Sequence, residues 1–307
     1  MISLLFLMKA LEKISFWNSN KYEMQARLFK GNSDELLLYI VGIGGTYGVF
    51  GNLLSDLAMQ NDTSFLWPMF EDMHDKRTTR RINSNGSLEE VVTGATWASL
   101  KNLQSEYDAL FDYIKKNCFK KISIVAVCGG CSKVIYYMLN NPEFKNMVGN
   151  LVLLAPEDYK LIEIHPKNVG MKEEAIYNLL HSGENKVLSK QFMGYMDMSS
   201  KTYLEYLYLK KYNTLPYYDA KTDLSYLKKI DMPVKIYMGQ YDRSIKDEPD
   251  GGIERLTHLT NGFSNAQYAI VSDSVHLFYD KEVEVVKSIA DFLNYKHIKM
   301  EGEKDYV

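Results

Sequence analysis

The sequence predicts a doubly wound α/β fold with a mostly parallel sheet. Two observations lead to this prediction. Short strand-like runs alternate along the chain with longer amphipathic stretches, which is the order of elements in proteins built from strand–helix–strand units. Runs such as Ile122–Val127 and Leu151–Leu154 are apolar on both faces, as expected for strands that helices cover on each side.

The expected strands are Tyr22–Phe29, Glu35–Val41, Ser64–Phe70, Lys121–Val127, Asn150–Leu154, Pro233–Met238 and Gln267–Val271. The expected helices are Val49–Met59, Trp97–Lys116, Ser132–Asn140, Ile253–Leu259 and Glu282–Tyr295. In the second of these helices, Leu103, Tyr107, Leu110 and Ile114 recur at helical spacing. They predict one apolar face that packs against the sheet.

The segment 159–229 interrupts this alternation, because it reads as several helices in succession. We expect a helical lid inserted into one core formed by residues 1–158 and 230–307. A helical decoration packed on the core, with no role at a site, is the alternative. The insertion leaves and re-enters the core beside the candidate site described below, which favours a lid.

Composition excludes several classes of protein. The chain has 307 residues and a net charge of −3, which gives no basic surface for nucleic acid. The apolar run Met1–Met8 is too short to span a membrane, and a first strand or docking segment is expected there. Three cysteines (Cys118, Cys128 and Cys131) indicate no disulfide framework and point to the cytoplasm. The histidines show no metal-ligand spacing, and the sequence does not indicate the oligomeric state.

The most informative passage surrounds Cys128, where an apolar strand meets a helix with almost no connecting loop. A nucleophile on such a turn adopts a strained backbone conformation, and the residues two before and two after it must be small. Ala126 and Gly130 satisfy this requirement for Cys128. Cys131 and Ser132 fail it, because each has a larger residue two positions later.

The segment Ala126-Val-Cys-Gly-Gly130 resembles the nucleophile elbow of the α/β-hydrolase superfamily, which is Gly-x-Ser-x-Gly in most members. A cysteine at this position is similar to dienelactone hydrolases and polyhydroxyalkanoate synthases. The following Val134-Ile-Tyr-Tyr137 is similar to hydrolases related to siderophore esterases. The resemblance implies an α/β-hydrolase fold and acyl-transfer chemistry, although alanine replaces the first glycine and cysteine replaces the serine.

The same resemblance implies an acid and a base further along the chain. Asp242 follows a late strand after Gly239-Gln-Tyr, and His276 follows the last strand. The order nucleophile, acid and base is the order of this superfamily. His276 would take the thiol proton, and Asp242 would orient the imidazole. Three nearby aspartates could replace Asp242 as the acid: Asp247, Asp250 and Asp273.

An oxyanion hole is the fourth part of this candidate site. In the resembling family the donors are the amide after the nucleophile and an amide in the loop after an early strand, which correspond here to Gly129 and to Ile43 or Gly44. Gly-rich loops also cradle phosphates. This one lacks the spacing of the common nucleotide-binding loops, so nucleotide binding is not favoured.

Cys128 and Cys131 also form a Cys-x-x-Cys pair, which is typical of dithiol redox proteins. The elbow spacing favours the nucleophile interpretation, and zinc is not favoured because no second ligand pair is visible. Cys131 remains a candidate redox partner whose disulfide with Cys128 would silence the nucleophile reversibly.

The sequence thus predicts an enzyme without a cofactor that hydrolyses an ester, thioester or lactone of a small molecule through a thioester on Cys128. An acyltransferase or condensing enzyme is a second possibility, and a binding protein with a degenerate hydrolase fold is a third. The basic run Lys76–Arg81 is either a contact for a substrate carboxylate or phosphate or, as we expect, a solvated loop.

Overall fold

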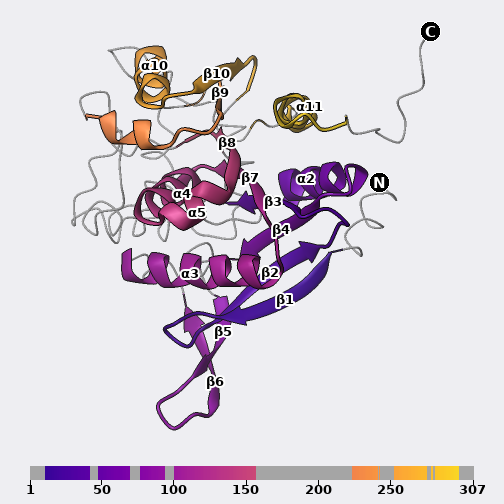
Figure 1. Ribbon diagram of the computed structural model, residues 1–307, viewed down its shortest axis with the longest axis vertical. Helices are drawn as coiled ribbons and strands as arrows, with labels where there is room; N and C mark the ends of the chain where they lie inside the picture. The colour runs from indigo at the N-terminus through magenta and orange to yellow at the C-terminus, as the bar shows by residue number, and fades with distance from the viewer. Residues whose placement is uncertain are drawn as a thin grey trace, which may run out of the picture.

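The computed structural model describes residues 11–41, 48–69, 77–93, 100–156, 223–240, 242, 252–274, 278 and 281–296. Within these residues the strands form an eight-stranded sheet and a two-stranded sheet. The order in the larger sheet is β1-β2-β4-β3-β7-β8-β9-β10, and helices lie on both of its faces (Figure 1). The predicted doubly wound α/β arrangement is confirmed.

The parallel part of the sheet consists of β3 (Glu35–Ile40), β4 (Ser64–Met69), β7 (Lys121–Val127), β8 (Val148–Leu154), β9 (Val234–Gly239) and β10 (Ala266–Val271). Two antiparallel strands, β1 (Glu12–Trp17) and β2 (Glu23–Phe29), extend it at one edge. All residues of β3 after Glu35 and of β7 after Lys121 are buried. Their apolar sequence on both faces follows from this burial, because water reaches neither face.

The strand order creates a switch point between β3 and β7. From β3 the chain moves to β4 on one side, and it then returns to β7 on the other side. At such a point the connections leave the carboxyl ends of neighbouring strands in opposite directions and open a crevice where ligands bind in open α/β sheets. The turn after β7 therefore lies at the position where a site is expected.

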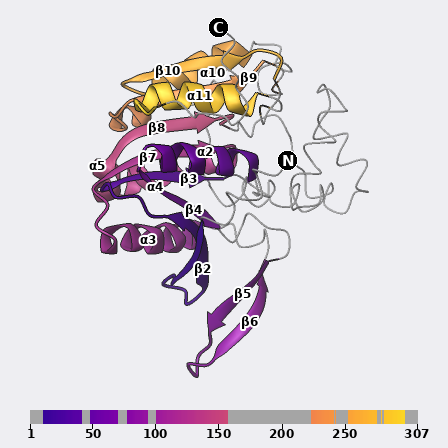
Figure 2. The same ribbon diagram turned by 90° about the vertical axis from the view of Figure 1, so that its right-hand side faces the viewer.

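Helices α2 (Gly48–Gln60) and α11 (Glu282–Leu293) cover one face of the sheet, while α3 (Leu100–Lys116), α4 (Gly129–Asn140) and α10 (Gly252–Gly262) cover the other (Figures 1 and 2). The predicted apolar face of α3 is confirmed by the burial of Tyr107, Leu110 and Ile114. The short helix α5 (Pro142–Met147) starts where the Asn141 side chain accepts a hydrogen bond from the backbone of Phe144, a normal helix N-cap.

Some elements differ from the sequence expectations. Helix α4 begins at Gly129 rather than at Ser132, directly after the candidate nucleophile. Strand β1 is not among the expected strands, although Ile14 and Phe16 alternate with polar residues, the pattern of a half-buried strand. The Phe16 ring stacks on Tyr113 of α3, with the ring centroids 5.2 Å apart. Packing against α3 therefore fixes this edge strand.

The basic run predicted as a solvated loop forms a strand instead. Strand β5 (Arg77–Ile82) pairs with β6 (Leu88–Thr93) in a hairpin that extends beyond β2 (Figure 2). The Arg80 guanidinium binds the buried carboxylate of Glu23, with 2.7 Å between Nε and Oε2. Arg81 binds Glu89 and donates to the Tyr22 hydroxyl over 3.1 Å. The bonds of Arg80 to Glu23 and of Arg81 to Tyr22 hold the hairpin to β2 and the residue before it, whereas the Arg81–Glu89 pair joins the two strands of the hairpin.

Most of the predicted lid, 159–229, lies outside the described residues and stays a prediction. Its last residues are described and contain the 3₁₀ helix η5 (Ser225–Lys229). Leu227 of this helix is fully buried and packs so close to Gly262 of α10 that a β-carbon there would lie 3.1 Å from its side chain. Leu227 is therefore already part of the core.

Asp56 of α2 makes the stability of the fold depend on pH. Its Oδ1 atom is buried without a hydrogen-bond partner among the described residues, and this burial raises the pKa of the carboxyl group to about 6. A carboxyl group whose pKa is raised by folding is stabilising while protonated, and the folded state loses stability as pH rises through the folded pKa.

We therefore expect Asp56→Asn to increase the free energy of unfolding at pH 8 by about 1 kcal/mol and to give little gain at pH 4. One pKa unit corresponds to about 1.4 kcal/mol, but solvent screens much of the effect because the side chain is only half buried. Urea denaturation at the two pH values measures the difference. An equal gain at both would show that the buried charge is not the cause.

Candidate active site

The turn after β7 has the strained geometry expected of a nucleophile elbow. Strand β7 ends at Val127 and α4 begins at Gly129, so Cys128 alone joins them. Its dihedral angles are φ 51° and ψ −127°, a region that costs a residue with a side chain about 1–3 kcal/mol. Two hydrogen bonds hold this conformation: the Cys128 N–H donates to Leu154 O over 2.8 Å, and its carbonyl accepts from the Cys131 N–H over 3.0 Å.

Gly130 explains why the position two residues after Cys128 must be small. A β-carbon there would lie 2.8 Å from the carbonyl oxygens of both Ile40 and Val41, at the end of β3. These are backbone atoms that cannot rotate away. The N-terminus of α4 therefore rests directly on the end of β3. Ala126, two residues before Cys128, is fully buried.

Cys128 is 3% exposed and is a reduced cysteine. It is the N-cap residue of α4, where the first backbone N–H groups of a helix have no partner within the helix. The positive end of the helix dipole is also at this position. Such a setting stabilises negative charge on a sulfur or on a substrate oxygen beside it.

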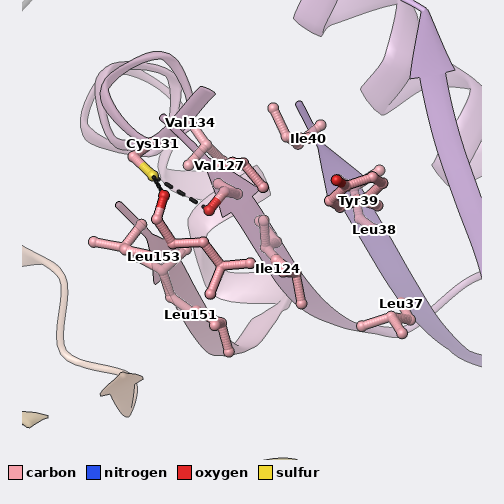
Figure 3. Close-up of a cluster of buried hydrophobic side chains, with 14 of the residues drawn as sticks. Leu37, Leu38, Tyr39, Ile40, Ile124, Val127, Cys131, Val134, Leu151 and Leu153 are labelled. Carbon is pink, nitrogen blue, oxygen red and sulfur yellow. Dashed lines mark hydrogen bonds between the residues drawn. The ribbon is translucent and has the colours of Figure 1, made fainter. Parts of the chain in front are cut away.

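Cys131 lies one turn into α4 and is fully buried. Its Sγ donates toward Ala126 O over 3.3 Å and toward Leu154 O over 3.7 Å, so the thiol faces the ends of β7 and β8 (Figure 3). Leu154 O is the same atom that accepts from the Cys128 N–H. Both cysteines are reduced in the structure, and the redox role of Cys131 stays a prediction.

Asp242 follows β9 in a tight turn, in which its N–H donates to Gly239 O over 3.0 Å. The residue is 2% exposed. Asp273, another candidate for the acid, is exposed and has a φ of 54° in the turn after β10. Burial beside the end of a parallel strand favours Asp242 over Asp273 as the residue that orients a base, because solvent screens an exposed carboxylate. The candidate acids Asp247 and Asp250 lie outside the described residues.

The predicted base His276 and the predicted oxyanion donors Ile43 and Gly44 also lie outside the described residues. The structure does place the strands that lead to them. β3, β7, β9 and β10 are parallel to their neighbours in one sheet, so the segments after them emerge at the same edge. Cys128 and Asp242 thus lie at the same edge of the sheet, after the carboxyl ends of β7 and β9.

Sequence reasoning missed Gln240, which connects the segments after β9 and β10. Its backbone N–H donates to Val271 O over 2.9 Å, and its side-chain Oε1 accepts from the Asp273 N–H over 3.0 Å. No local sequence signal marks this residue, because both partners belong to another strand and its turn.

Neither a metal cluster nor a membrane-spanning helix is found in the part of the chain that the structure describes. Those residues contain no cluster of three or more His, Cys, Asp or Glu side chains arranged to bind a metal ion. None of the helices in the same segments combines the length and the apolar character needed to cross a lipid bilayer.

Comparison with known proteins gives matches at the level of structure. An esterase from Rhodococcus sp. ECU1013 superimposes with a TM-score of 0.60 at 14% identity, over 92% of this chain and 98% of that chain. A predicted CIB-like hydrolase from Thermoplasma acidophilum gives 0.53 at 15% identity, over 92% and 98%. Naproxen esterase from Bacillus subtilis gives 0.55 at 11% identity, over 95% and 98%.

The chain has the α/β-hydrolase fold. No protein-family model matches the sequence, and no curated protein matches it. At these identities the likeness concerns the fold, and the chemistry has to be argued from the residues.

Proposed function

We propose that this α/β-hydrolase-fold protein is an acyl-transfer enzyme with Cys128 as its nucleophile, and that it hydrolyses an ester, thioester or lactone of a small molecule. The strained turn at Cys128 is the observation that carries the proposal. A backbone conformation with φ 51° and ψ −127° is unfavourable for a residue that carries a side chain. Such strain concentrates at functional sites. The esterase names of several structural neighbours support hydrolysis.

In the proposed first step, His276 accepts the Cys128 thiol proton and the sulfur attacks the substrate carbonyl carbon. The carbonyl π electrons move to oxygen, and the N–H groups of Gly129 and of Ile43 or Gly44 stabilise the resulting oxyanion. The oxyanion collapses, the bond to the leaving group breaks, and the imidazolium returns its proton to that group. Asp242 orients the imidazole and stabilises its charged form.

A thioester on Cys128 remains after this step. His276 then removes a proton from water as the water oxygen attacks the thioester carbonyl carbon. The tetrahedral intermediate collapses, the C–S bond breaks and the carboxylic acid is released, while the imidazolium returns its proton to the Cys128 thiolate. An amine, alcohol or thiol in place of water gives the acyltransferase. The chemistry on Cys128 is the same, and only the acceptor differs.

Acyl-enzyme trapping tests this proposal. The protein is mixed with p-nitrophenyl acetate, quenched in acid, digested and analysed by fragmentation mass spectrometry. We expect one acetyl group on Cys128, and none in Cys128→Ala. Acetylation confined to the exposed Cys118, or none at all, would favour a non-catalytic hydrolase-fold protein. Added hydroxylamine shows whether an amine competes with water for the acyl group.

A further inference from the structure

Gln240 joins the turns that follow β9 and β10, and the proposed chemistry gives this residue no role. It is the first residue after β9 and stands two positions before Asp242. Strands β9 and β10 are parallel neighbours (Figure 1), so the turns that follow them lie side by side. One of these turns leads to Asp242, and the other leads to His276.

The two hydrogen bonds of Gln240 cross between these turns. Its backbone N–H donates to the carbonyl of Val271, the last residue of β10, over 2.9 Å. Its side chain reaches further along the same turn and accepts the Asp273 N–H over 3.0 Å. The backbone bond continues the β9–β10 ladder by one step, whereas the side-chain bond is extra. The side chain thus extends the connection between β9 and β10 beyond the end of the sheet.

The backbone of Asp273 makes this side-chain bond useful. Asp273 has a φ of 54°, a left-handed conformation that is unfavourable for most residues with a side chain and that Asp tolerates better than most of them. The hydrogen bond from its N–H to Gln240 Oε1 holds this backbone conformation against the turn after β9. His276 follows three residues later in the sequence.

We propose that Gln240 is a positioning residue, which sets the separation of the acid and the base by fixing the turn after β10 to the turn after β9. The inference rests on the proposed function, because it assumes that Asp242 and His276 work together on Cys128. Gln240 touches no reacting atom in this scheme. Its effect is transmitted through the Asp273 backbone.

The test compares Gln240→Met, which keeps the length of the side chain and removes the acceptor, with Gln240→Glu, which keeps an acceptor oxygen. We expect kcat of Gln240→Met to fall by about 10-fold with KM unchanged, since a misplacement of about 1 Å can cost up to about 100-fold. Gln240→Glu should recover most of the lost kcat. Gln240 is exposed, so the core is not altered by either change.

Gln104→Met is a matched control, because it removes another side-chain hydrogen bond, 2.9 Å to Asp108 within α3, and should leave kcat unchanged. Equal kcat for Gln240→Met and wild type would overturn the inference, as would equal losses in Gln240→Met and Gln240→Glu. If Cys128→Ala is inactive in the same assay, such a result rejects only the role of Gln240. If Cys128→Ala is fully active, the proposed function itself fails.

Discussion

Cys128→Ala is expected to lower kcat/KM for an activated ester by on the order of 10⁴–10⁶-fold, because removal of a nucleophile that works with a base abolishes the covalent route. The fold should be retained. The thiol is small and alanine keeps the β-carbon, so the two backbone hydrogen bonds that hold the turn are unaffected. Steady-state kinetics give the loss, and far-UV circular dichroism verifies the fold.

Cys118→Ala is the matched control for this experiment. Cys118 is exposed, is reduced and also has a positive φ, of 60°, so the same change is made at another cysteine with a positive φ. Its rate should equal that of wild type. A Cys128→Ala variant that stays within a few-fold of wild type would exclude Cys128 as the nucleophile and would indicate another group at this edge of the sheet.

Gly130→Ala should have the second largest effect, on stability and on activity together. The new β-carbon would lie 2.8 Å from the carbonyl oxygens of Ile40 and Val41, so α4 and the end of β3 must separate. Overpacking of this kind typically costs about 1–3 kcal/mol of unfolding free energy. The same separation moves Cys128 and the Gly129 N–H away from the segment after β3, so kcat should fall as well. Urea denaturation and kinetics measure the two effects.

Gly149→Ala provides the comparison. A β-carbon at Gly149 in β8 would lie 2.9 Å from the Cε atom of Lys121, which is the far end of a flexible side chain that can move into solvent. Stability and kcat should therefore change little. If Gly130→Ala matched Gly149→Ala in both measurements, the close contact between α4 and β3 would not control the site.

Many strands and helices of the core could be predicted from the sequence, because the spacing of apolar residues along a segment indicates which of its faces are buried. Strand β7 has the predicted bounds, Lys121–Val127, since a run buried on both faces is mostly apolar and therefore stands out in the sequence. β5 was missed because all but one of its side chains are polar or charged. It forms a strand through pairing with β6, the next strand along the chain, and through the Arg80–Glu23 ion pair, whose carboxylate is far from β5 in sequence.

For the site, residues 126–130 were enough to predict that Cys128 occupies a strained turn, because an apolar strand runs directly into a helix there and small residues stand two positions before and after the cysteine. Asp242 could be selected only as one of several aspartates, and its burial separates it from Asp273. The role of Gln240, and the reason why position 130 must be glycine, were decided by the tertiary structure. Both depend on which strands lie side by side, β9 with β10 and β7 with β3. Strand order is set by the burial of the whole sheet between its helices, which no single segment encodes.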